Sequence, residues 1–366
     1  MTDLLQRMIA IPSLSRDEKA VADFLEGWLA DQGLQPHRCG NNLWCAAGSG
    51  PAILMDAHID TVKPVAGWKR DPFTPSMEDG RLYGLGSNDD GASVVALIEA
   101  YRQLIARPQP YTLVLSLSAE EESSGRNGLE VSLAEIEAAH GPIACGVFGE
   151  PTSLEMVVAE KGLMVLDCAV TGVAGHAARE GGVNAIYQAL PAIEWFRSKR
   201  FGKVSELLGP VKMTVTQIGA GTQHNVIPDL CTFVVDIRSN GLYTNEELLT
   251  LIEAEAPCQV KARSTRLCGS SIGKDHPLVQ RGLSLGLPAV GSPTLSNQAL
   301  VRFPSVKLGP GDSPRSHTAD EYVDIDDIGK AVDIYVSLLD QLVVIPSEAK
   351  ESKSIFVYEN LEQRIR

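Results

Sequence analysis

An apolar segment that ends abruptly in acids and imidazoles constrains the fold of this chain most strongly, and it occurs three times. In ILMDAHIDTV, residues 53–62, the apolar run leads into His58 and Asp60 at alternate positions. The segments YTLVLSLSAEEESSG and IACGVFGEPT repeat the pattern. Because alternate residues of an extended chain point the same way, we expect His58 and Asp60 to share a face where the strand leaves the core.

One helical pattern precedes these strands and another lies between the first two. The segment SRDEKAVADFLEGWLADQG begins with Ser15 as a possible N-cap and ends at Gly33, and GASVVALIEAYRQLIA carries an apolar stripe at helical spacing. Alternating strands and helices predict an α/β fold, with a mainly parallel sheet and helices on both faces. In such a sheet, ligands bind outside the carboxyl ends of the strands.

The pattern changes in the middle of the chain. LMVLDCAVTG, KMTVTQIGAG and DLCTFVVDIRS are typical of strands exposed on one face, and helices are expected at 184–198 and 244–255. An inserted α+β domain is therefore expected at 163–267, dividing a catalytic domain into residues 1–162 and 268–366. The chain ends in a charged tail, SEAKESKSIFVYENLEQRIR, for which loose packing is expected.

Composition limits the partners and the location. The net charge of -14 argues against nucleic acid or an anionic membrane as the main partner, although not against an anionic small molecule. The seven cysteines are scattered and never form C-x-x-C, which is typical of reduced thiols. Neither a signal peptide nor a membrane-spanning run is evident. We therefore expect a soluble protein of the cytoplasm.

Acids and imidazoles gather at the expected carboxyl edge of the sheet. The candidates are His58, Asp60, Asp89, Asp90, Glu120, Glu121, Glu122, Glu150 and His317. Each alone has an ordinary explanation, such as a turn or a solvated loop. Together, crowded carboxylates repel one another unless a positive charge neutralises them. Imidazole and carboxylate ligands suit Zn²⁺ or a similar divalent ion, so a metal centre is the better hypothesis.

The order of the motifs adds a resemblance. DAHIDTV, GLGSNDDG, SAEEESSG, FGEPT, GHAA, NVIP…DIR and GPG…SHT together resemble the dinuclear-metal deacetylase and aminoacylase family. That family includes acetylornithine deacetylases, succinyl-diaminopimelate desuccinylases and related peptidases. The resemblance extends over nearly the whole chain. It implies two divalent ions per subunit, Zn or Co, and five metal ligands: His58, Asp89, Glu122, Glu150 and His317.

By this resemblance Asp89 bridges the two metals, Asp60 orients His58, and Glu121 is the general base. One departure concerns the bridging position. Family members commonly follow the bridging Asp with a small or apolar residue, then Lys and Gly, whereas Asp90 and Gly91 stand here. Either Asp89 or Asp90 could therefore bridge, and Asp89 is favoured from its distance to GLG.

Three further residues come from the inserted segment. His176 in GHAA resembles the family histidine that stabilises the oxyanion, which a partner subunit contributes, so a homodimer through the inserted domain is implied. Asn225 and Arg238 match a substrate-binding pair, in which Arg238 would hold the α-carboxylate. The alternative is that Arg238 is a surface residue pairing with Asp236 or Glu247.

The leading interpretation is an N-acetyl-L-amino-acid deacetylase of arginine biosynthesis, acting on N-acetylcitrulline or N-acetylornithine. Glu160 stands where many acetylornithine deacetylases carry His, which could signal a neutral side chain on the substrate. A dipeptidase or aminoacylase with the same metals is the nearest alternative. A ligand-binding relative without catalysis is an alternative from another class.

Overall fold

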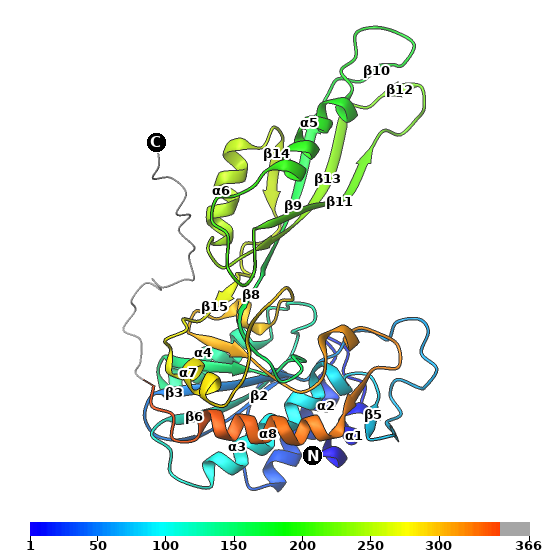
Figure 1. Ribbon diagram of the computed structural model, residues 1–366. Coiled ribbons are helices and arrows are strands. Elements are labelled where there is room, and N and C mark those ends of the chain that lie inside the picture. Colours follow the sequence, from blue (N-terminus) through cyan, green and yellow to red (C-terminus); the bar gives the residue numbers. More distant parts are fainter. Residues whose placement is uncertain (345–366) are drawn as a thin grey trace, which may run out of the picture. The chain divides into compact units, whose positions relative to one another are not determined.

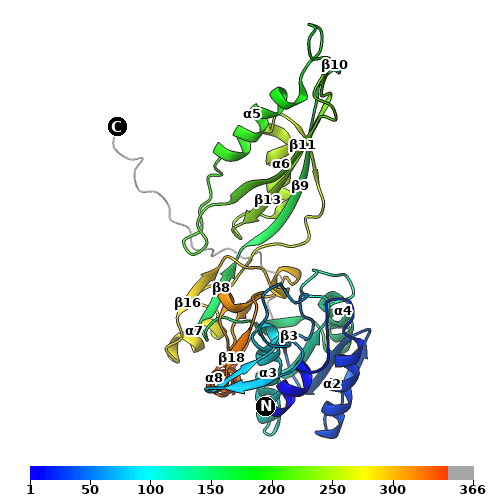
Figure 2. The same cartoon turned by 90° about the vertical axis from the view of Figure 1, so that its right-hand side faces the viewer.

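A computed structural model of the chain describes residues 1–344, and the charged tail lies outside the described residues. The chain divides into two compact units. Unit 1 comprises residues 1–158, 271–290 and the described part of 296–353, and unit 2 comprises residues 159–270 and 291–295 within the described part of the chain. The two units are described separately (Figures 1 and 2).

A nine-stranded sheet forms the centre of unit 1. Its inner strands β6, β3, β7 and β17 pair in parallel, whereas β1 and β2 at one edge and β8 at the other are antiparallel. The prediction of a mainly parallel α/β sheet is therefore confirmed. The path runs through β1 (His37–Cys39), β2 (Asn42–Gly48), β6 (Thr112–Ser118), β3 (Ala52–His58), β7 (Ile143–Phe148), β17 (Ser305–Lys307), β8 (Met156–Glu160) and β15 (Ser270–Ser271), and β16 (Ala289–Ser292) pairs with β8.

Helices cover both faces of this sheet. The helices α3 and α8 pack against each other below the sheet in Figure 1, and α4 lies on the opposite face. On the α4 side, Leu129 and Ile136 join the core formed by Leu54, Val114 and Phe148. The helices are α1 (Thr2–Ile9), α2 (Lys19–Asp31), α3 (Ala92–Ile105), α4 (Leu129–His140), α7 (Pro277–Ser284) and α8 (Ile325–Leu339).

The N-cap expected at Ser15 is wrong. Helix α2 begins at Lys19 and Glu18 is its N-cap residue. Arg16 has a φ of 76°, in the left-handed region, so the backbone is not helical there. The Glu18 carboxylate accepts a hydrogen bond from the Arg16 backbone N–H, which stabilises this turn ahead of the helix.

Unit 1 also contains short elements outside the nine-stranded sheet. A second sheet of β18 (Tyr322–Asp324), β5 (Arg81–Tyr83) and β4 (Ser76–Glu78) is antiparallel. Three single turns complete the unit: η1 (Ser87–Gly91), η2 (Asn297–Leu300) and η3 (Ser313–Arg315). No helix within residues 1–344 is both long and apolar enough to cross a membrane.

Unit 2 has a four-stranded antiparallel sheet with two helices on one face. Met164, Leu166, Phe233 and Val235 point from the sheet into a core shared with the helices. The sheet has the order β11 (Lys212–Ala220), β13 (Leu230–Ser239), β9 (Gly162–Thr171), β14 (Gln259–Ala262), the helices are α5 (Ala185–Ser198) and α6 (Asn245–Glu255), and β10 (Gly175–His176) pairs with β12 (Val226–Ile227). The two helices begin and end within one residue of their expected positions.

Candidate metal centre

Strand ends of the parallel sheet bring four of the candidate residues together, and the turn η1 adds Asp89. His58 ends β3, Glu121 and Glu122 follow β6, and Glu150 follows β7. One potential ligand atom from each of His58, Asp89 and Glu122 lies within 4.8 Å of the others. The same holds for His58, Glu121 and Glu150. His58 belongs to both groups, so the two groups form one continuous centre.

Asp89 lies between the two histidines of this centre. Its Oδ1 is 3.1 Å from Nε2 of His58, and its Oδ2 is 3.7 Å from Nε2 of His317. His317 Nε2 is also 3.0 Å from an oxygen of Glu122. A carboxylate that presents one oxygen to each imidazole has the geometry for bridging two cations.

Asp60 has a different set of contacts from the expected one. The Nδ1–H of His58 donates to the backbone carbonyl of Asp60 at 2.9 Å, while the Asp60 carboxylate is 3.5 Å away. That carboxylate instead accepts hydrogen bonds from the backbone N–H groups of Glu121 and Glu122, both at 3.1 Å. Residue Asp60 therefore fixes the His58 tautomer and holds the loop that carries both glutamates.

Electrostatics support a cation at this place. Burial is the main cause that raises the pKa of Glu121 to about 8, and it also raises the pKa values of Glu122 and Glu150. Hydrogen bonding to Glu122 raises the pKa of His317 to about 9. Buried carboxyl groups that repel one another are stabilised by divalent ions, and imidazole with carboxylate is a suitable donor set for them. The residues present therefore fit a centre for two divalent metal ions.

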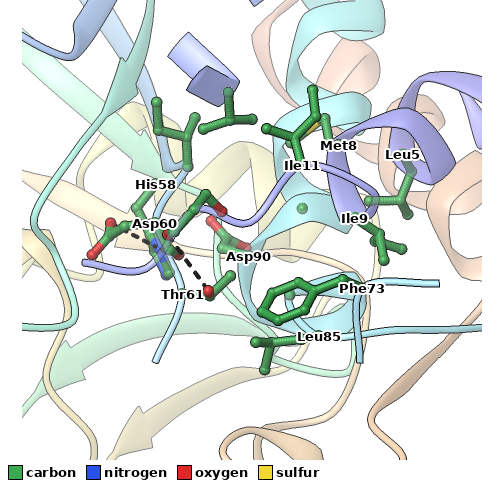
Figure 3. Close-up of a pocket in the computed structure, with 15 residues that line it drawn as sticks. Leu5, Met8, Ile9, Ile11, His58, Asp60, Thr61, Phe73, Leu85 and Asp90 are labelled. Carbon is green, nitrogen blue, oxygen red and sulfur yellow. Dashed lines mark hydrogen bonds and ion pairs between the residues drawn. The ribbon is translucent and has the colours of Figure 1, made fainter. Parts of the chain in front are cut away.

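Asp90 belongs to neither group of potential ligand atoms, although it lines the same cavity as His58 and Asp60. It is 1% exposed and lines a cavity of about 20 Å³ beneath α1, among Leu5, Met8 and Ile9 (Figure 3). Burial raises the pKa of Asp90 to about 8, so its carboxyl group binds a proton more strongly than an exposed Asp does. Asp89 is thus the acid placed between His58 and His317.

The glycine at the position of the missing lysine has a steric reason. A Cβ at Gly91 would lie 2.5 Å from the carbonyl oxygen of Gly86 and 2.7 Å from a methyl group of Leu5. Helix α1 therefore occupies the space that a side chain at this position would need. A side chain at position 91 would therefore clash with the backbone of Gly86 as well as with α1.

The structure adds one buried carboxylate that sequence reasoning missed. Glu321 is 2% exposed and accepts hydrogen bonds from backbone N–H groups next to Asp89. Its signal in the sequence is weak, because TADEYVD looks like a charged turn before a short strand. Only the folded chain shows that Glu321 faces inward.

The three candidate residues of unit 2, or residues next to them in sequence, form hydrogen bonds within their own unit. His176 and Asn225 are exposed and adjacent, since the Ala177 N–H donates to the Asn225 carbonyl at 2.9 Å. Arg238 lies on β13, where its guanidinium makes two hydrogen bonds to the Asp236 carboxylate at 2.9 and 3.1 Å. This is the surface pairing considered as an alternative. The roles of His176, Asn225 and Arg238 stay predictions.

An α/β fold with overlapping imidazole and carboxylate groups at the strand ends is typical of metal-dependent hydrolases. Residues 54–341 match the family described as peptidase family M20/M25/M40. The chain therefore belongs to this family and is a metal-dependent amidohydrolase. The family predicted from the motifs is confirmed.

Two curated relatives show the range of names in this family. A succinyl-diaminopimelate desuccinylase of Stenotrophomonas maltophilia is 34% identical over 255 residues, covering 65% of this chain and 68% of the relative. An acetylornithine deacetylase of Proteus mirabilis is 28% identical over 360 residues, covering 88% of this chain and 92% of the relative. The names of these two relatives refer to different acyl groups, succinyl and acetyl, so the similarity supports the family and not one acyl group.

Solved structures share the fold. The aminopeptidase PepT of Bacillus cereus has a TM-score of 0.73 at 19% identity, covering 93% of this chain and 97% of that chain. A protein of Bacillus subtilis described as a dinuclear metal binding peptidase has a TM-score of 0.69 at 15% identity, covering 93% and 98%. At these identities the comparison establishes the fold alone.

Proposed function

We propose that the chain hydrolyses the amide bond of an N-acyl-L-amino acid, with N-acetylcitrulline or N-acetylornithine as substrate in arginine biosynthesis. The observation that carries this proposal is the placement of Asp89 between His58 and His317, with Glu121 in the same centre. His58 and Glu150 would hold the first metal, Glu122 and His317 the second, and Asp89 both.

Two divalent ions, Zn²⁺ or Co²⁺, would lower the pKa of a water molecule and polarise the amide carbonyl. Glu121 is placed to take the proton from the attacking water and to deliver it to the departing amine nitrogen. Asp60 keeps Glu121 in position through its backbone N–H. The Nδ1–H bond of His58 to the Asp60 carbonyl leaves Nε2 as the ligand atom.

Residues of unit 2 would complete the site. His176 would donate a hydrogen bond to the oxyanion that develops on the carbonyl oxygen. Arg238 would bind the free α-carboxylate after releasing Asp236, and Asn225 would assist in binding the substrate. These assignments rest on the motif resemblance.

We also propose that the chain forms a homodimer through unit 2, with His176 acting in the partner's site. Exposed apolar side chains on α5 and on the neighbouring strands support an interface there: Tyr187, Leu190, Ile218 and Leu230. Strand β11 supports it too, because it lies at the edge of its sheet. The test mixes His176→Ala chains with Glu121→Gln chains, each inactive alone. Restored activity supports sharing, and no restoration places the complete site within one chain.

A second candidate substrate is an N-succinyl amino acid, favoured by the 34% identity to a desuccinylase. Succinyl groups carry a second carboxylate, so this activity needs an additional cation at the acyl end of the substrate. The dipeptidase and aminoacylase alternatives would use the same metals and the same base. They differ from the proposed activity in the group that takes the place of the acetyl group. The scattered spacing of the seven cysteines, without a C-x-x-C pair, supports the expected cytoplasmic location.

The deciding experiment is a substrate screen on metal-reconstituted protein. N-acetylcitrulline, N-acetylornithine, N-succinyl-diaminopimelate and a panel of dipeptides are compared by kcat/KM. The proposal predicts the highest value for one of the two acetyl substrates. A higher value for the succinyl substrate or a dipeptide would replace it, and tight binding without hydrolysis of any substrate would favour a ligand-binding protein.

A further inference from the structure

Glu321 connects two segments that carry proposed ligands of the second metal. We name residues 84–91 the Asp89 loop and residues 312–321 the His317 loop. The Oε1 of Glu321 accepts hydrogen bonds from the backbone N–H groups of Asn88 and Asp89, both at 2.9 Å. Its Oε2 accepts one from Gly86 at 3.1 Å. One buried carboxylate of the His317 loop therefore takes three N–H donors of the Asp89 loop.

Asn88 makes the reciprocal connection. Its Oδ1 accepts a hydrogen bond from the Asp312 backbone N–H at 2.8 Å, and its Nδ2 donates to the Asp312 carbonyl at 3.2 Å. The same Nδ2 also donates to the Ser316 hydroxyl at 3.3 Å. The close approach requires a glycine, because a Cβ at Gly311 would lie 2.5 Å from the Asn88 Oδ1. Asn88 of the Asp89 loop therefore bonds to the His317 loop, and Glu321 of the His317 loop bonds to the Asp89 loop.

The proposed ligands differ in what holds them. His58 is the last residue of β3 and pairs with Ser118 of β6. Glu150 follows Gly149, whose N–H donates to the Asp56 carbonyl of β3 at 2.7 Å. His317 belongs to a loop, has a φ of 60° and is 53% exposed. The separation between His317 and Asp89 therefore depends on the connection between the loops rather than on the sheet.

We propose that Glu321, together with Asn88, is a positioning residue that sets the separation of Asp89 and His317 and thereby selectively tightens binding of the second metal ion. This inference rests on the proposed function of a two-metal hydrolase. The three donors to the Glu321 carboxylate are backbone N–H groups of the Asp89 loop, so Glu321 acts through that loop. Loss of such an outer partner typically weakens metal binding about 10–100-fold.

A neighbouring acid supplies a matched control. Asp320 also uses a carboxylate to accept backbone hydrogen bonds, from Lys69 at 3.0 Å and Arg70 at 3.1 Å. It lies in the His317 loop beside Glu321, but it holds a segment without proposed ligands. Asp320→Asn therefore changes the same chemistry at the same loop without touching the connection to Asp89.

The experiment compares stepwise Co²⁺ binding to the metal-free full chain of the wild type, Glu321→Gln and Asp320→Asn. Calorimetry gives the affinities of the first and second equivalents, and the visible spectrum of each equivalent reports its coordination. In Glu321→Gln the amide N–H₂ faces the Gly86 N–H, so two donors oppose each other. We expect the second affinity to fall about 10–100-fold with an altered second spectrum, and the first to change less than about threefold.

The outcomes separate the inference from the proposed function. Asp320→Asn should bind both equivalents as the wild type does. Equal weakening of both equivalents in Glu321→Gln, or no weakening, would overturn the inference even if the melting temperature fell. Wild-type protein that binds fewer than two Co²⁺ would overturn the proposed two-metal function and the inference with it. If Glu321→Gln does not fold, Asn88→Ala removes the other connection and must show the same selective loss.

Discussion

The candidate residues of unit 1 and those of unit 2 differ in burial and in their partners. His58 is 2% exposed in contact with Asp89, whereas His176 and Asn225 are exposed. Arg238 is paired with Asp236 on the surface of its own strand. The unit 1 residues lie together in one centre, whereas the roles of the unit 2 residues stay predictions.

This difference follows from the supporting elements. Parallel strands end at the same edge of the sheet, so side chains that follow β3, β6 and β7 are brought together as the sheet forms. His176 lies instead on a pair of two-residue strands, β10 and β12, and its side chain is exposed. This difference matches the proposed roles, in which unit 1 would hold the metals and unit 2 would contact the substrate.

The largest expected effect is in unit 1. Glu121→Gln should lower kcat by about 10²–10⁴, because the amide cannot take a proton from water, while the metal content stays unchanged. Glu120→Gln is the matched control, since the Glu120 side chain bonds to Asn127 instead. Near-normal turnover in Glu121→Gln would show that Glu121 is not the general base. The unit 1 cluster would then be less clearly distinguished from the exposed unit 2 residues.

The next effect tests unit 2. His176→Ala should lower kcat by about 10²–10³ through loss of one oxyanion donor, with metal binding unaffected. His224→Ala alters another exposed histidine near Asn225 and should change kcat by less than about twofold. Comparable rates for the two variants would show that the exposed end of unit 2 takes no part in catalysis.

Substrate binding gives a smaller effect. Arg238→Lys keeps the charge but loses the planar fork, so we expect KM to rise about 10-fold with little change in kcat. Asp236→Asn removes the surface ion pair and should leave KM within about twofold of the wild type. A rise in KM for Asp236→Asn equal to that for Arg238→Lys would mean that the pair is structural.

The smallest effect concerns protons in unit 1. The pKa is raised to about 8 at Glu121 and about 9 at His317, so the metal-free centre holds protons at pH 7. Metal ligands must be deprotonated, so metal binding at pH 7 should release protons, and metal affinity should fall as the pH is lowered. Calorimetry in two buffers with different ionisation enthalpies measures this release. Identical heats in both buffers would contradict it.

The sequence predicted the parts of the molecule that depend on local pattern. Period-2 and helical spacing predicted the parallel sheet, and helices α5 and α6 within one residue. Acids and imidazoles beside apolar runs indicated a candidate site at the sheet edge, and the motif resemblance selected the proposed metal ligands among them. The lid and dimerisation roles expected for residues 163–267 stay predictions.

Long-range packing could not be predicted. Nothing local shows that the Asp60 carboxylate accepts from Glu121 and Glu122, 61 and 62 residues away. The N-cap at Ser15 was wrong because Arg16 adopts a left-handed turn. Glu321 was missed because a single acid in a polar loop carries no sign of burial.

A crystal structure of Co²⁺-loaded protein, with anomalous scattering recorded at the cobalt edge, tests the central claim most directly. Two anomalous peaks are predicted, one on either side of the Asp89 carboxylate, the first against His58 and Glu150 and the second against Glu122 and His317. A single peak, or peaks that avoid Asp89, would contradict a shared two-metal centre and the hydrolytic function proposed for it.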